Sequence, residues 1–208
     1  MGWLSDLQAG VALTHSDVPE GLPALRGRTL LDAPFFVSHD FARGRRQRLG
    51  YEARWRHGPV GVQSEYIRVT TERRGEAVDD SDLSPLLATG WYVSGTWALT
   101  GERKSRGLDR PRHPILRGGV GALEVASRLE SVRFGSAASS EPPSRSPRAE
   151  VVSPNRDRAM TLGLNWYLNR WVKVQGNLVR ERVDDPSLGP DASRPVFWSR
   201  LLRLQVTL

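Results

Sequence analysis

The chain has 208 residues, contains no Cys, and carries 30 Lys plus Arg against 23 Asp plus Glu, which gives a formal net charge of +7. The absence of Cys excludes a disulfide scaffold, a Cys-ligated zinc site and thiol catalysis. No apolar run reaches the roughly 20 residues that a membrane-spanning helix needs. Hydrophobic residues make up only 38% of the chain, so composition alone points to a basic, water-soluble protein.

The dominant pattern along the chain is a two-residue alternation of apolar and polar side chains, which predicts β-strands. It recurs in eight segments: residues 7–14, 49–56, 60–66, 90–102, 121–134, 161–168, 172–178 and 202–208. Many of these segments approach the roughly 9–11 residues of a tilted membrane-spanning strand, whereas strands of soluble domains average about 5–6 residues. The pattern therefore predicts an all-β protein whose strands are long enough to cross a bilayer.

The connections between these segments are of two kinds. Tight turns are predicted at residues 57–59 and 169–170, and long polar loops at 16–46, 73–88, 135–156 and 184–195. Counting strands places the long loops at one end of the sheet and the tight turns at the other, which is typical of an outer-membrane barrel. One basic segment, 103–118, belongs to the turn side although it is long. We therefore expect a single, partial antiparallel transmembrane β-barrel domain over residues 1–208.

Five of the seven Trp residues lie near the predicted strand ends, where a barrel carries aromatic girdles at both membrane interfaces. The predicted girdle consists of Trp55, Trp91, Trp166, Trp171 and Trp198. The alternative is that these side chains pack the core of a soluble β protein.

Strand parity separates a lipid-facing set of side chains from a set facing a water-filled lumen. The predicted pore-lining cations are Arg54, Arg56, Arg128, Lys173 and Arg203, and the predicted pore-lining carboxylates are Glu52, Glu65, Glu124 and Glu130. A wet channel with an excess of cations favours anions. Arg128 could instead be neutralised by Glu124 or Glu130 in a wall-stabilising pair. Lys173 and Arg203 have no obvious carboxylate neighbour on their own strands.

Four stretches of the sequence resemble the phosphate-selective porin O and P family. They are residues 58–66 (GPVGVQSEY), 90–102 (GWYVSGTWALTGE), 121–129 (GALEVASRL) and 161–169 (TLGLNWYLN). Their order and spacing extend the resemblance over roughly residues 30–208, and residues 7–15 fit as one further strand.

The resemblance implies a 16-stranded barrel of which this chain is the C-terminal half. It also implies a trimeric anion channel in the outer membrane of a Gram-negative bacterium, open to small anions such as phosphate and surrounded by membrane lipid and lipopolysaccharide. The family's constriction loop falls in the half that is absent here. The chain departs from outer-membrane barrels at its end, where Leu208 replaces the usual aromatic residue. Because Met1 begins no signal peptide, we expect that an upstream segment was lost.

Other functions find less support in the sequence. The basic run in 103–118 lacks the aromatic residues of a nucleic-acid site, so we expect a solvated periplasmic loop and no nucleic-acid partner. The four His residues form no metal-ligand or triad spacing, so no cofactor, no metal and no enzymatic activity are expected. Three alternatives stay open: a soluble β-sheet binding module, an enzyme at the barrel rim using His15 or His39, and a truncated porin without function.

Overall fold

The computed structural model describes residues 6–23, 25–37, 41–104, 108, 110–137 and 141–207. Within these ranges eight strands form one sheet, in which each strand pairs antiparallel with the next along the chain. The strands are β1 (Gln8–Pro23), β4 (Phe41–His57), β5 (Val60–Arg73), β6 (Leu83–Ala98), β7 (Ala122–Ser136), β8 (Asn155–Tyr167), β9 (Val172–Val183) and β10 (Val196–Val206). The predicted all-β, antiparallel architecture is confirmed.

The strands extend further than the alternation indicated. β1 and β4 run well into the segment 16–46, and β5 and β6 leave only residues 74–82 as a loop where 73–88 was predicted. The reason is that the ladder continues beyond the apolar part of each strand. On β8, residues 155–158 pair normally with β7 although their sequence is NRDR. Charged residues replace apolar ones on the outward face there, and the hydrophobic alternation ends before the strand does.

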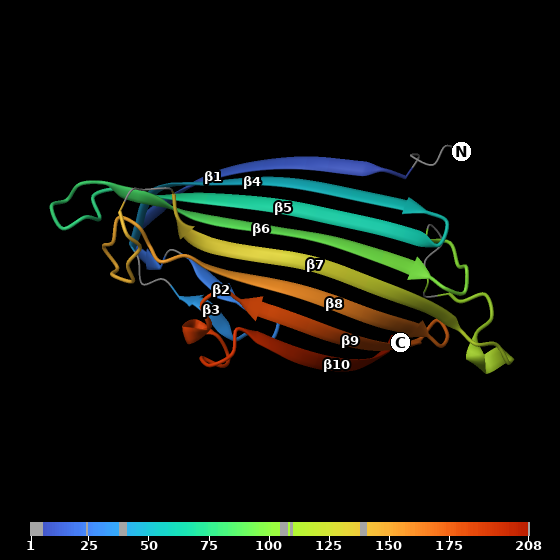
Figure 1. Cartoon of the computed structure of the whole chain (residues 1–208). Coiled ribbons are helices and arrows are strands. Elements are labelled where there is room, and N and C mark those ends of the chain that lie inside the picture. The colour runs from blue at the N-terminus through green and yellow to red at the C-terminus, as the bar shows by residue number, and fades with distance from the viewer. Residues whose placement is uncertain are drawn as a thin grey trace.

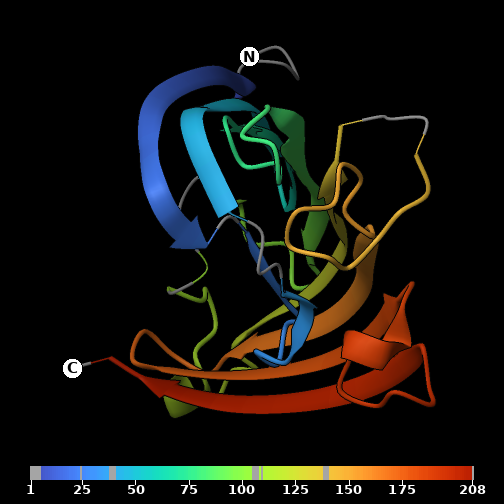
Figure 2. The ribbon, with the colours of Figure 1, turned by 90° about the vertical axis from the view of Figure 1, so that its left-hand side faces the viewer.

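The sheet is strongly curved and open. Figure 1 shows the strands side by side, and the view along them in Figure 2 shows a C-shaped cross-section. β1 and β10 are the two edges, each paired on one side only. The strand pairing within this chain therefore does not close the sheet into a barrel. No helix in the described ranges is long and apolar enough to cross a membrane.

Long and short connections lie at opposite ends of the sheet (Figure 1). At one end are the segments 24–40, 74–82, 137–154 and 184–195, the last containing the 3-10 turn η3 (Pro186–Leu188). At the other end are the turns 58–59 and 168–171 and the segment 99–121, which contains the 3-10 turn η2 (Ile115–Arg117). We call these the loop end and the turn end.

A small hairpin lies inside the curve of the sheet at the loop end (Figure 2). It is formed by β2 (Arg26–Arg28) and β3 (Pro34–Val37) within the segment expected to be an irregular loop. Phe35 and Phe36 are fully or almost fully buried, and their ring centroids lie 5.7 and 5.0 Å from that of Phe134 on β7. The Asn155 side-chain amide donates to the Phe35 carbonyl at 2.5 Å, and the Leu30 amide donates to Glu181 at 2.7 Å. Apolar packing and polar anchors together hold the hairpin on the concave face.

Candidate permeation surface

The register divides the sheet into two chemically different faces. The convex face carries exposed apolar side chains, among them Val11 (73% exposed), Leu164 (46%) and Leu204 (66%). A soluble sheet sandwich would bury such a face against a second sheet, and the described chain contains no such layer. The hairpin and the side chains that pack beneath it lie on the other, concave face.

All nine predicted pore-lining residues lie on the concave face. Cross-strand pairing places Arg54 opposite Gln63, Gln63 opposite Ser94, and Ser94 opposite Arg128. The next row of the same face holds Glu52, Glu65, Tyr92 and Glu130, and a third row towards the turn end holds Glu124, Asn165, Gln175 and Arg203. Lys173 follows one step further, opposite Tyr167 and Gln205. The parity assignment of these side chains agrees with the register.

Arg128 is a neutralised cation. Its Nε lies 2.6 Å from Glu130 Oε2, and its guanidinium stacks 3.8 Å from the centroid of the Tyr92 ring. The Tyr92 hydroxyl in turn accepts a hydrogen bond from the Gln63 amide at 2.7 Å. The geometry therefore matches the wall-stabilising pair, which leaves Arg128 contributing little net charge to the concave face.

The four other predicted cations have no carboxylate partner among the described residues. Arg54 contacts the side-chain oxygen of Gln8, and Lys173 lies 4.7 Å from the centroid of the Tyr167 ring. Arg56 and Arg203 are exposed on the concave side. These four side chains leave positive charge without a counter-charge towards the turn end of the concave face.

Lys104, in the segment that joins β6 to β7, is an additional cation in this region. Its ammonium contacts the Glu124 carboxylate, which also accepts a hydrogen bond from the Asn165 amide at 2.9 Å. Only 10% of the Lys104 side chain is exposed. Burial, reinforced by the charges of Arg56 and Lys173, lowers the pKa of Lys104 to about 8. The charge of this side chain therefore changes close to neutral pH.

The position of Lys104 corrects the expectation that 103–118 is simply a solvated loop. Leu108 and Pro111 are buried, while Arg110, Arg112 and Arg117 stay exposed. Residues 105–107 and 109 lie outside the described part of the chain. The segment folds back because the Lys104 amide donates to the Gly58 carbonyl at 2.8 Å and the Gly121 amide donates to the His113 carbonyl at 2.8 Å. The alternation of apolar and polar residues within a strand does not predict that the segment after it folds back against the sheet.

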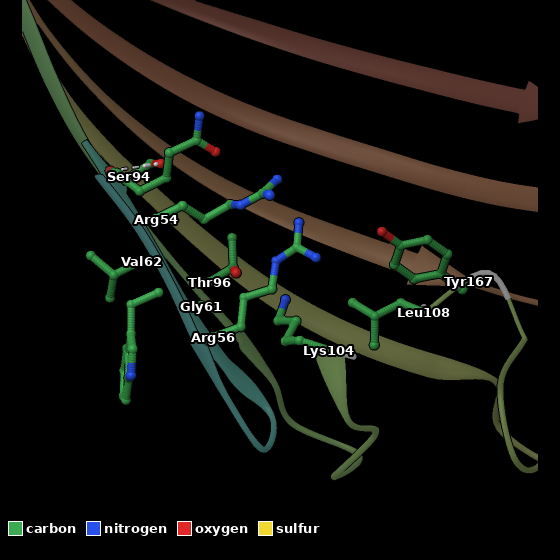
Figure 3. A pocket seen from close by; sticks show the side chains of 11 residues that line it. Arg54, Arg56, Gly61, Val62, Ser94, Thr96, Lys104, Leu108 and Tyr167 are labelled. Atoms are coloured by element: carbon green, nitrogen blue, oxygen red, sulfur yellow. Dashed lines mark hydrogen bonds between the residues drawn. The ribbon is translucent and has the colours of Figure 1, made fainter. Parts of the chain in front are cut away.

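An open hollow of about 390 Å³ lies on the concave face near the turn end, beside Lys104. Arg54 and Arg56 project into it from β4, Ser94 and Thr96 line it from β6, and Lys104 and Tyr167 complete it (Figure 3). The cations donate hydrogen bonds and carry positive charge, and the hydroxyl groups can donate or accept. Such a surface can hold a hydrated anion transiently, without the enclosed geometry that would bind it tightly.

The predicted Trp girdle is only partly placed at strand ends. Trp55, Trp166 and Trp171 lie at the turn end, and Trp198 is the third residue of β10 at the loop end. Trp91 lies in the middle of β6, because β6 begins at Leu83, well before the predicted strand. Trp91 is nevertheless opposite Tyr66, which is opposite Tyr51, so three aromatic residues form a row across the convex face.

His15, one of the two histidines of the rim-enzyme alternative, forms no catalytic arrangement with the described residues. His15 lies on β1, its Nε2 4.0 Å from Asp17, and both side chains are exposed. His39 lies outside the described residues. No group of three or more possible metal ligands occurs within the described ranges.

Comparison with known proteins gives two matches. A model of the family described as "Phosphate-selective porin O and P" matches residues 33–205. The chain is also similar to Porin O of Pseudomonas aeruginosa, with 26% identity over 138 residues. That alignment covers 65% of this chain but only 30% of the relative.

Proposed function

Because the chain belongs to the phosphate-selective porin O and P family, we propose that it forms part of the wall of a water-filled, anion-preferring channel in the outer membrane of a Gram-negative bacterium. The main support is the separation of the two faces. In hydrocarbon every backbone group must be paired within the protein, and charged side chains must face water. The apolar convex face and the charged concave face of this sheet meet the second requirement, and the antiparallel pairing meets the first except at the two edges.

The proposal extends to closure of the barrel. The two edges of the sheet need partners, since an unpaired edge in a membrane leaves backbone groups unsatisfied. We propose that this chain supplies the C-terminal eight strands of a 16-stranded barrel and that the full-length parent is a homotrimer. The alignment covers only 30% of Porin O, so that relative is considerably longer than this chain. A truncated porin without function is the competing proposal.

Small anions such as phosphate are the proposed solutes. Arg54, Arg56, Lys173 and Arg203 attract anions, while the hydroxyl-lined wall around Ser94 and Thr96 replaces part of their hydration shell. The β2–β3 hairpin occupies part of the concave side at the loop end, so we propose that it narrows the path there. The solutes would then pass the hairpin before they reach the four cations.

Cysteine accessibility tests this arrangement directly, because the chain contains no Cys of its own. Ser94→Cys lies on the concave face, and Val93→Cys, its neighbour on β6, lies on the convex face. With the full-length parent in planar bilayers, freed of any Cys outside this chain, we expect a negatively charged, water-soluble thiol reagent to reduce the current through Ser94→Cys and to leave Val93→Cys unchanged. Equal modification of both variants would contradict a lumen-facing concave surface. Failure of the full-length parent to conduct at all would contradict the channel.

A further inference from the structure

The convex face changes character towards the loop end of the last four strands. On β8, the alternate residues Asn155, Asp157 and Ala159 are buried on the concave side, so Arg156 and Arg158 lie on the convex side. The same alternation places arginines on β7, β9 and β10. We call the whole set the outer arginine cluster: Arg133, Arg156, Arg158, Arg180, Arg182 and Arg200.

The cluster is poorly neutralised. Arg133 is directly opposite Arg156, and Arg158 is directly opposite Arg182. Like charges directly opposite each other destabilise a sheet, so these pairs need a counter-charge. Asp184 supplies one carboxylate, 2.5 Å from Arg158 and 4.0 Å from Arg156. In the described residues, no outward position of β7 to β10 carries an Asp or Glu. An anion from outside the chain would remove the repulsion.

The location of the cluster indicates which kind of anion. Immediately towards the turn end, the convex face becomes apolar, with Met160, Leu178 and Trp198 all exposed. Arg180 is directly opposite both Met160 and Trp198. Most of the arginines thus border the apolar belt, at the depth where the polar head groups of a bilayer meet its hydrocarbon core. Arg200, which is opposite Leu178, lies one row inside the belt.

The cluster is also local. On the other side of the sheet, outward-facing Arg45 lies 3.4 Å from Glu72, so that arginine is already paired. At the turn end the border of the apolar belt is marked by Trp55, Trp166 and Trp171. Arg68 on β5 also faces outward, in the same row as Arg133, because Thr89 is opposite both residues. The unneutralised positive charge therefore belongs to the loop end of the convex face and is densest on β7 to β10.

We propose that the outer arginine cluster is a docking surface for the phosphorylated head group of an outer-leaflet lipid, a proposal that rests on the membrane position argued above. Guanidinium groups bind phosphate oxygens in pairs of parallel hydrogen bonds. A phosphate between Arg158 and Arg182 replaces their repulsion by two attractive contacts, and the acyl chains of the same lipid cover Leu178, Met160 and Trp198.

The test uses the full chain in detergent and measures bound lipid by native mass spectrometry. The probes are bis-phosphorylated lipid A and its dephosphorylated form. The variant is Arg158→Gln/Arg182→Gln. The control, Arg110→Gln/Arg117→Gln, removes the same charge from exposed positions at the turn end. Because a charge-assisted hydrogen bond contributes about 1.5–3 kcal/mol, we expect affinity for the phosphorylated lipid to fall about tenfold or more in the variant only. All three proteins should bind the dephosphorylated lipid equally weakly.

Three results would overturn the proposal: no loss in the variant, an equal loss in the control, or displacement of the lipid by inorganic phosphate at the same concentration. If the variant loses its β-sheet circular dichroism, Arg180→Gln/Arg200→Gln provides the same test on neighbouring positions. Channel current distinguishes this proposal from the channel itself. If the variant binds lipid as tightly as the unmodified protein while the full-length parent conducts, the docking proposal is rejected and the channel proposal stands. If lipid binding depends on the cluster but the full-length parent does not conduct, the channel proposal is rejected and the docking proposal stands.

Discussion

Lys104 is expected to make the proposed channel sensitive to pH. Its pKa is lowered to about 8, so the side chain is positively charged below that pH and loses its charge as the pH rises above it. Anion preference should therefore fall when the pH is raised from 7 to 9. The measurement is the reversal potential under a KCl gradient at each pH. Lys104→Arg should keep its preference up to pH 9, since guanidinium stays protonated. An unchanged pH dependence in this variant would show that another group titrates.

A charge introduced on the convex face of β8 should destabilise the protein more than a charge introduced on its concave face. Leu164 is outward-facing, and Thr161 lies on the concave face opposite Arg128. We expect Leu164→Arg to lower the free energy of unfolding in lipid by about 2–4 kcal/mol if the residue lies at mid-bilayer, because a lipid-facing charge is costly there. Thr161→Arg should change it less, because its guanidinium meets water and the charge of Arg128 opposite it is already paired with Glu130. Urea titration in lipid vesicles measures both, and equal costs would contradict the assignment of faces.

Single-residue parity left two interpretations of Arg128 open, a charge in the lumen or a pair with Glu124 or Glu130, and could not decide between them. The alternation placed Arg128 and Glu130 on one face, and only the structure shows that they pair. In the alternation, Asn165 is only one more polar, inward-facing residue. It accepts from Gln175 at 2.7 Å and donates to Glu124, so it belongs to a hydrogen-bonded network. Pairing depends on side-chain rotamers and on neighbouring strands, which a pattern along one strand does not contain.

At the scale of elements, the β2–β3 hairpin is the feature that the sequence did not reveal. Its strands are only three and four residues long, too short for alternation to be recognised. The hairpin is held by contacts with distant residues such as Phe134 and Glu181, which have no counterpart in local sequence. The long strands, by contrast, were predictable, because each presents an apolar face over many residues.

The hairpin should be displaced by a larger residue at Gly27. A Cβ atom there would lie 2.6 Å from a ring carbon of Phe134 and 2.7 Å from one of Phe35, both far inside van der Waals contact. We expect Gly27→Val to free the hairpin from the concave face, which should raise single-channel conductance and expose the segment 24–40 to protease. Gly176→Val is the matched control, because a Cβ there meets nothing within 4 Å. A normal conductance and protease pattern in Gly27→Val would mean that the hairpin stays in place.

At the scale of the whole molecule, the low hydrophobic content no longer indicates a water-soluble protein. A curved sheet with one apolar and one charged face needs hydrophobic residues at only alternate positions, so 38% is compatible with a membrane wall. The net charge is +7, and cations without a carboxylate partner gather on two separate surfaces of the sheet, the concave face near the turn end and the outer arginine cluster near the loop end; the basic segment 103–118 carries further exposed arginines. The sequence predicted the architecture of the sheet, whereas its open edges became visible only in the structure.

The central claim is that the unpaired cations of the concave face make the channel prefer anions. The most direct measurement is the reversal potential of the proposed full-length parent, which contains this chain as its C-terminal half, in planar bilayers under a KCl gradient. We predict chloride permeability above that of potassium, and a shift towards equal permeability in Arg54→Gln/Arg203→Gln but not in the control Arg110→Gln/Arg117→Gln. A potassium-selective channel, or one whose selectivity is the same in both double variants, would contradict the account.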